Sequence, residues 1–131
     1  MHIKYKLDKS KNHGIGLFAD EDIKKEQVIY TASPILDVNI TNEQFDSLSD
    51  NEQKEVKYWG FWIEKDKVWH VDFDVSKFLN HSFEPNTTQD FGRDDAYLTA
   101  TRDIKSGEEL TQNYLEFESK DVLRSRGIDV D

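Results

Sequence analysis

Short apolar runs separated by turn residues are the feature that most constrains the fold of this chain. Six such runs, of four to six residues each, are found at 3–7, 28–31, 35–38, 58–63, 68–73 and 96–101. Runs of this length, rich in β-branched and aromatic residues, predict strands. The chain has 131 residues, which is the usual size of one domain. We therefore expect a single, mostly β domain with a little helix.

Local patterns refine this expectation. The segment 61–71 predicts a hairpin, because two aromatic-rich arms flank a polar tip at 64–67. Within 41–57, Thr41 precedes Gln44 by three residues, and Ser49 precedes Glu52 by three. This spacing is that of the capping box at a helix start, so one or two short helices are expected there. Weak helical periodicity after residue 114 predicts a C-terminal tail that docks on the domain.

Composition excludes several classes of protein. The chain contains no cysteine, which rules out disulfides, thiolate catalysis and cysteine-based zinc sites. Its net charge of −10 would repel a phosphate backbone, so we expect no direct contact with nucleic acid and favour a basic protein or peptide as partner. No run approaches the roughly 18 apolar residues of a membrane helix, and the N-terminus is too polar for a signal peptide. We expect no membrane contact and a cytoplasmic protein.

Three polar segments could carry chemistry. In the first, His13-Gly14-Ile15-Gly16, glycine would permit close approach of a ligand, although a glycine turn leading into a strand is the simpler explanation. The second contains Asn80, His81 and Ser82. The third, 107–114, ends in Tyr114, whose neutral hydroxyl could orient an amine. For an isolated tyrosine, a buried side chain bonded to backbone or water is the simpler explanation.

Two further interpretations of the histidines are weaker. A serine hydrolase would need His81 to act on Ser82, but adjacent residues of an extended chain point apart and no G-x-S-x-G turn is present. His70 and Asp72, with Asp74, could place metal ligands on one strand face. Hydrogen-bonded strand residues explain that group more simply, so no metal is expected.

The order of the three polar segments resembles that of the SET-domain family. GIGLFA at 14–19, NHSFEPN at 80–86 and GEELTQNY at 107–114 correspond to the family's three signatures. The resemblance extends over roughly residues 4 to 118. It implies a SET domain over 1–118 with the docked tail at 119–131, and a β-clip fold whose last motif passes through a loop to form a C-terminal pseudoknot.

The resemblance also implies an activity, that of a protein-lysine N-methyltransferase. Such an enzyme transfers a methyl group from S-adenosylmethionine to the ε-amine of a lysine, here in a basic protein such as a histone or histone-like protein. Tyr114 would be catalytic, and Tyr58 would be a second catalytic tyrosine. The residues implied to bind the cofactor are His13, Gly14, Ile15, Gly16, Asn80 and His81.

The chain departs from the family pattern at two positions. Phe83 stands where many members have a zinc-binding cysteine, and Asn113 stands where an acidic residue is usual. These features are similar to those of minimal, free-standing SET proteins of viruses and bacteria, which occur as monomers or homodimers. A viral or pathogen origin would make a host nucleus or secretion the alternative location. Two alternatives stay open: a catalytically weak module that binds S-adenosylmethionine or a peptide, and a β-clip scaffold that binds neither.

Overall fold

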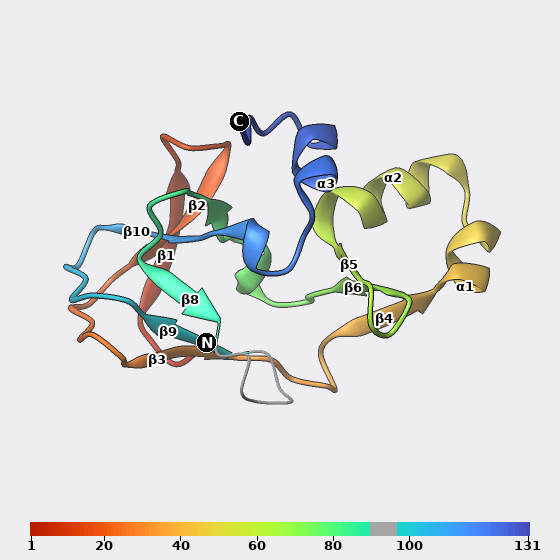
Figure 1. Cartoon of the computed structure of the whole chain (residues 1–131). Helices are drawn as coiled ribbons and strands as arrows, with labels where there is room; N and C mark the ends of the chain where they lie inside the picture. Colours follow the sequence, from red (N-terminus) through yellow and green to blue (C-terminus); the bar gives the residue numbers. More distant parts are fainter. Residues whose placement is uncertain (90–96) are drawn as a thin grey trace. The chain divides into compact units, whose positions relative to one another are not determined.

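The chain divides into two units, each formed from two separate stretches of sequence. The computed structural model describes residues 1–89 and 97–131 (Figure 1). The first unit contains Met1–Ala32 and Phe78–Glu116, and the second contains Ser33–Lys77 and Phe117–Asp131. The single domain with a boundary at residue 118 stays a prediction.

The first unit contains two sheets. One has the strand order β1-β2-β10-β7 and the other the order β3-β9-β8. Strand β10 pairs antiparallel with β2 through Glu109 and Leu110 and parallel with β7 through Thr111 and Gln112. The elements are β1 (Tyr5–Lys9), β2 (Ile15–Ala19), β3 (Val28–Thr31), β7 (Asn80–His81), β8 (Thr87–Gln89), β9 (Tyr97–Ala100), β10 (Glu109–Gln112) and the short 3-10 helix η2 (Tyr114–Glu116).

Aliphatic side chains from these strands form the core of the first unit. Leu17 of β2 and Leu110 of β10 are Cα partners in the sheet, and both are fully buried. Ile29 of β3 is fully buried as well. Outside the named strands, Ile23 and Ile104 are nearly fully buried and form an isolated β-bridge. Burial of such side chains stabilises the unit by about 1.5 to 3 kcal/mol each.

A buried asparagine holds β10 from the segment that precedes β8. The Asn86 side chain is 3% exposed. Its Oδ1 accepts from the Thr111 backbone N–H at 2.9 Å, and its Nδ2 donates to the Glu109 carbonyl at 2.8 Å. Thr87 Oγ1 donates to the Thr111 carbonyl at 2.8 Å. These side chains supply the bonds that a neighbouring strand would otherwise supply, and they bring together the two segments that the predicted pseudoknot requires.

The second unit combines a small sheet with three α-helices. The strand order is β4-β6-β5, with every pair antiparallel. The predicted hairpin with its tip at 64–67 is confirmed, because β5 and β6 pair on either side of that turn. The elements are β4 (Val38–Thr41), α1 (Asn42–Ser47), α2 (Asp50–Trp59), β5 (Phe61–Ile63), β6 (Val68–Val71), the 3-10 helix η1 (Val75–Phe78), which ends in the first unit, and α3 (Lys120–Ser125).

Both predicted capping boxes are present. Thr41 caps α1 with Gln44 bonding back to it, and Ser49 caps α2 with Glu52 in the same role. At each helix start the capping side chain accepts a hydrogen bond from the backbone N–H three residues later, and the side chain of that later residue accepts one from the backbone N–H of the cap. The prediction succeeded because all the groups involved lie within four residues of one another.

Two predicted strands are shifted. The run 58–63 was expected to be one strand, but its first two residues form the last turn of α2, and β5 begins only at Phe61. A glycine occupies the junction between α2 and β5, because a Cβ at Gly60 would lie 2.7 Å from the His70 carbonyl oxygen. The run 35–38 contributes only Val38 to β4, because residues 34–36 form a turn. Residue 96 of the last predicted run lies outside the described residues.

The C-terminal tail packs within the second unit through Arg126. Its guanidinium donates to the Glu118 carboxylate at 2.6 Å and to the Gly60 carbonyl at 2.8 Å. The Lys57 carbonyl accepts a third bond at 3.0 Å. Burial raises the pKa of Glu118, although Arg126 acts to lower it. The tail is therefore bonded to the end of α2.

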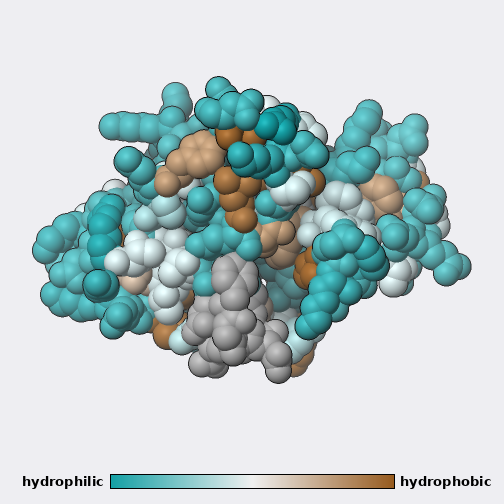
Figure 2. Space-filling view, in the orientation of Figure 1, coloured by the Kyte–Doolittle hydropathy of each residue, from teal (hydrophilic) through white to brown (hydrophobic). Residues whose placement is uncertain are grey.

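The visible surface is mainly polar. Figure 2 shows hydrophilic residues over most of one face, with small apolar areas between them. Of the helices in the described residues, none has both the length and the apolar character needed to cross a membrane.

Replacing Asn86 by alanine is expected to destabilise the protein by about 2 to 5 kcal/mol. The substitution leaves one buried backbone donor and one buried acceptor of β10 without partners, and each unmet group costs about 1 to 3 kcal/mol. Urea denaturation measures the loss. Asn51→Ala, at an exposed position of α2, is the matched control and should change stability by no more than about 0.5 kcal/mol. Equal effects of the two substitutions would contradict the role given to Asn86.

Candidate functional site

The residues implied to bind the cofactor come together in the first unit. His13 and Gly14 lie in the loop between β1 and β2, and Ile15 and Gly16 begin β2. Asn80 and His81 form β7. Strand β10 lies between β2 and β7 in the sheet, so two segments more than 60 residues apart in sequence reach one place through it.

The Asn80 side chain joins these segments. It is largely buried, and its Nδ2 donates to the His13 carbonyl at 3.0 Å and to Glu109 Oε1 at 2.9 Å. The Ile15 carbonyl lies 3.2 Å from the same nitrogen. One amide group therefore fixes the backbone on both sides of Gly14 and connects it to β10.

Glu109 completes this network, and the sequence interpretation missed it. Its carboxylate accepts from Ser10 Oγ at 2.7 Å and from Asn12 Nδ2 at 3.1 Å, in addition to Asn80. The neighbouring Glu108 instead accepts from Arg102 at 3.0 Å. Alternation along a strand puts adjacent side chains on opposite faces. The sequence holds the two glutamates side by side, but no signal in it shows which one faces the loop.

The two glycines of the loop are required for different reasons. A Cβ at Gly16 would lie 2.2 Å from Glu109 Oε1, so any other residue at this position would force the carboxylate to move. Gly14 has φ of +50°, the left-handed conformation that glycine adopts without strain. No described heavy atom outside its chain neighbours lies within 4 Å of a Cβ built at Gly14. The backbone at Gly14 can therefore be approached closely by a ligand.

His81 is held in one tautomer. Its Nδ1 accepts from the Tyr114 backbone N–H at 3.1 Å, so the neutral ring carries its proton on Nε2. That Nε2 is buried and has no hydrogen-bond partner in the described part of the chain. Burial lowers the pKa of His81, which favours the neutral ring. A buried donor without a partner suits a ligand that brings an acceptor to this point.

Tyr114 lies beside the histidine. The two ring centroids are 5.3 Å apart, and Phe83 packs edge-on against the other side of the imidazole at 4.4 Å. The Tyr114 hydroxyl donates a short hydrogen bond to the Leu79 carbonyl. A phenol oxygen oriented by donating its proton presents its lone pairs in a fixed direction. This is the geometry needed to accept a hydrogen bond from an amine.

Asn113 keeps a structural role where the family usually has an acid. Its Oδ1 accepts from the Leu115 backbone N–H at 3.0 Å, at the start of η2. An amide oxygen can cap a helical turn as a carboxylate does. The substitution therefore leaves a side chain that positions η2, whose first residue is Tyr114.

Tyr58 and Ser82 are not part of this group. Tyr58 belongs to the second unit, in the last turn of α2, and is 58% exposed; its catalytic role stays a prediction. Ser82 Oγ accepts from the Glu84 backbone N–H at 3.1 Å. His81 Nδ1 accepts a hydrogen bond from the Tyr114 backbone N–H. Ser82 and His81 therefore do not form the hydrogen-bonded pair that a serine hydrolase requires.

The neutral state of His81 predicts a pH effect on stability. A partly buried histidine with a lowered pKa binds its proton less readily in the folded state than in the unfolded state, in which the pKa is about 6.5. Stability is therefore fully present above about pH 6.5 and is lost as the pH falls below it. Chemical denaturation from pH 7.5 to 5 should show the wild type losing stability relative to His81→Asn, which does not titrate there. Parallel curves for the two proteins would contradict the effect, because other titrating groups cancel in the difference.

A family model described as the SET domain matches residues 14–115 of the chain. A putative histone-lysine N-methyltransferase, ASHH4, from Arabidopsis thaliana is 32% identical over 125 residues. The match covers 86% of this chain and 34% of the length of the relative. A variant-silencing SET domain-containing protein from Plasmodium falciparum is 29% identical over 119 residues. That match covers 82% of this chain and 5% of the length of the relative. The chain thus spans about a third of the length of the first relative and about a twentieth of the length of the second.

Solved structures agree with the family match. A putative histone methyltransferase of Plasmodium falciparum has a TM-score of 0.63 at 21% identity, with 87% of this chain and 95% of that chain covered. A chain of the Polycomb repressive complex 2 of Chaetomium thermophilum, bound to S-adenosylmethionine, has a TM-score of 0.67 at 28% identity. The match covers 96% of this chain and 17% of that chain. The mostly β SET-domain fold expected from the sequence is confirmed. The chain therefore belongs to the SET-domain family.

Proposed function

We propose that this protein transfers a methyl group from S-adenosylmethionine to the ε-amine of a lysine in a basic protein. The observation that carries the proposal is the set of contacts that joins the loop at Gly14, the Asn80-His81 pair and Tyr114 within one unit. Family membership over residues 14–115 supports the same activity.

The cofactor would be held by the loop and by β7. The backbone at His13 to Gly16, the Asn80 side chain and His81 are the groups that would bind it, and the buried Nε2 of His81 suits an acceptor atom on a ligand. A related structure is described as bound to S-adenosylmethionine. When bound, S-adenosylmethionine supplies an electrophilic methyl group on a sulfonium.

Tyr114 would orient the lysine amine. A hydroxyl whose proton is directed to the Leu79 carbonyl can accept an N–H of the amine and so direct the amine's lone pair away from itself. The amine must be neutral to attack, and a channel that excludes water would disfavour the ammonium form. Holding reacting atoms about 3 to 3.5 Å apart in the correct direction supplies much of the rate.

The net charge of the chain, −10, favours a basic substrate. Opposite charge raises the rate of encounter and selects among partners. The Arabidopsis relative is described as a putative histone-lysine N-methyltransferase. We therefore propose a histone or histone-like protein, or another lysine-rich protein, as the substrate, with the cytoplasm as the place of reaction.

Methyl transfer tests the proposal directly. Purified protein is incubated with radiolabelled S-adenosylmethionine and a set of basic proteins, beside Tyr114→Phe. The wild type should label lysine, and Tyr114→Phe should label it about 10- to 100-fold more slowly, because positioning of the amine is lost, while its affinity for S-adenosylmethionine is retained. Tyr5→Phe, at an exposed position of β1, is the matched control. Equal rates for wild type and Tyr114→Phe would remove Tyr114 from the mechanism.

The loop geometry predicts a separate effect on cofactor affinity. Gly16→Ala should weaken S-adenosylmethionine binding by more than about 10-fold, because the added Cβ displaces the Glu109 carboxylate that holds Asn80. Gly60→Ala is the matched control, since its Cβ is also crowded, at 2.7 Å from the His70 carbonyl, but lies in the second unit. Calorimetry should show unchanged affinity per folded molecule for the control. Similar affinity losses in both variants would contradict the assignment.

A further inference from the structure

Four polar side chains lie on one face of the sheet in the second unit. The register of β4 and β6 pairs Val38 with Val71 and Asn39 with His70. Continuing it by one pair sets Asp37 opposite Asp72. Since alternate residues share a face, these two carboxylates lie on the same face as Asn39 and His70. Like charges directly opposite each other across two strands are destabilising, so this arrangement requires compensation.

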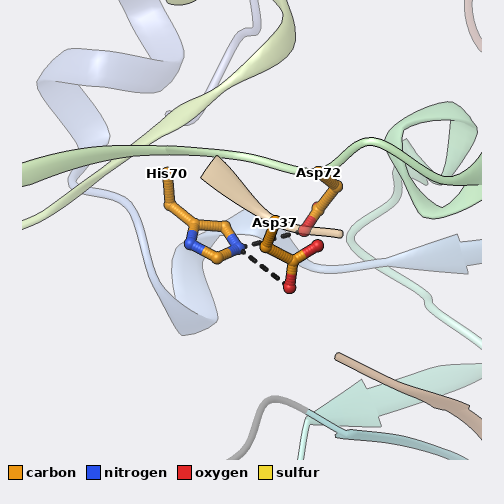
Figure 3. Close-up of side chains that lie close together, drawn as sticks. All are labelled: Asp37, His70 and Asp72. Atoms are coloured by element: carbon orange, nitrogen blue, oxygen red, sulfur yellow. Dashed lines mark hydrogen bonds and ion pairs between the residues drawn. The ribbon is translucent and has the colours of Figure 1, made fainter. Parts of the chain in front are cut away.

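The carboxylates of Asp37 and Asp72 converge on one nitrogen of His70 (Figure 3). His70 Nε2 lies 3.0 Å from Asp72 Oδ1 and 3.7 Å from Asp37 Oδ2. The three potential ligand atoms all lie within 4.8 Å of one another. Asp74, which the sequence had grouped with His70 and Asp72, instead accepts from the Ser76 backbone N–H at 2.8 Å. Asp37, more than 30 residues earlier in the chain, takes the expected place of Asp74.

Asn39 fixes the direction of the histidine ring. His70 Nδ1 lies 2.7 Å from Asn39 Oδ1, and an amide oxygen can only accept. Nδ1 therefore carries the proton of the neutral ring, and the lone pair of Nε2 faces the two carboxylates. Three acceptors that face one another need a positive charge between them.

The group is shielded from water, which strengthens this requirement. The side chains of Asp37, His70 and Asp72 are 4%, 13% and 15% exposed. Asp37 Oδ1 is buried with no hydrogen-bond partner among the residues that the structure describes. Burial, followed by the charge of Asp72, raises the pKa of Asp37 to about 6. The Phe61 ring packs on the imidazole at 5.0 Å and adds to the apolar surroundings.

We propose that Asp37, His70 and Asp72 form a binding site for a divalent transition-metal ion, with Zn²⁺ as the ion that fits best. Imidazole and carboxylate ligands suit this class, and a three-ligand zinc site leaves its fourth position to water. Two ligand atoms about 2.0 Å from a tetrahedral ion are about 3.3 Å apart, and the separations of 3.0 and 3.7 Å lie on either side of that value. The two carboxylates balance the ion's charge.

Asn39 would serve this site as an outer partner. A metal-bound histidine usually donates its other N–H to an oxygen, which fixes its tautomer and ring orientation. The bound ion would connect the residue preceding β4 to the residue following β6, and so stabilise the edge of this sheet. The proposal differs from the expectation from sequence that no metal is bound, and it does not depend on the proposed methyl transfer.

Metal titration of the full chain tests the site. Protein stripped with a chelator is titrated with ZnCl₂ by calorimetry, and with Co²⁺ by visible absorption. One equivalent should bind, with the intense absorption of four-coordinate Co²⁺. Asp37→Asn, which keeps the shape of the side chain, should weaken binding by more than about 100-fold, and Asn39→Ala by about 10- to 100-fold. Asp74→Asn is the matched control, because asparagine can still accept from Ser76, and it should bind as the wild type does.

Two results would overturn the site. The first is a wild type that binds no equivalent of Zn²⁺, or that binds one with an affinity which Asp37→Asn leaves unchanged. The other is a His70 ring that remains protonated on Nε2 when Zn²⁺ is present, measured from its ¹⁵N and ¹³C chemical shifts. In that case the balancing charge is a proton, held by the hydrogen bond that His70 Nε2–H donates to the Asp72 carboxylate, which raises the pKa of His70 against the effect of burial. A change of the Nε2 shift to that of a metal-bound nitrogen supports the site even if a variant folds poorly.

Discussion

The hydrogen bonds from two buried asparagines to β10 are the interactions on which the first unit depends. Asn86 binds two backbone groups of β10, and Asn80 binds the Glu109 side chain on the same strand. Burying a side-chain amide costs free energy unless its donors and acceptors are met. Here the Asn86 amide bonds to the backbone of β10, and the Asn80 amide bonds to the Glu109 carboxylate and to the His13 carbonyl. The two side chains therefore add bonds to β10 beyond those of its strand pairing.

This arrangement explains why polar residues follow so closely on Phe78 and Leu79. Asn80 reaches the loop at Gly14, and His81 reaches the Tyr114 backbone. Segments from three parts of the chain are therefore fixed relative to one another. The proposed methyl transfer needs little acid-base chemistry at carbon and much positioning, and a rigid hydrogen-bonded network provides it.

Prediction from sequence succeeded where the determining groups are close along the chain. The capping boxes at Thr41 and Ser49 and the hairpin tip at 64–67 are local patterns. The strand expected to begin at residue 58 was wrong, because an apolar run of this kind is compatible with helix or strand, and the close contact of Gly60 with the His70 carbonyl decides where the helix ends. Local patterns could not reveal that contact.

The same distinction between local patterns and contacts made by the fold holds for the residues of the candidate sites. The glycine loop and the Asn80-His81 pair could be named from motifs, because each motif is continuous. Glu109 could not be distinguished from Glu108, since only the packing of β10 shows which carboxylate faces Gly16. Asp37 was missed because its proximity to His70 follows from strand register.

The central claim is that the loop at Gly14, the Asn80-His81 pair and the turn at Tyr114 form one cofactor site. An NMR titration of ¹⁵N-labelled protein with S-adenosylmethionine tests it most directly. The account predicts saturable shifts of the amides of 13–16, 80–82 and 112–114, with the His81 Nε2–H signal among them. Saturable binding that leaves these signals unchanged, or no binding at all, would contradict the account.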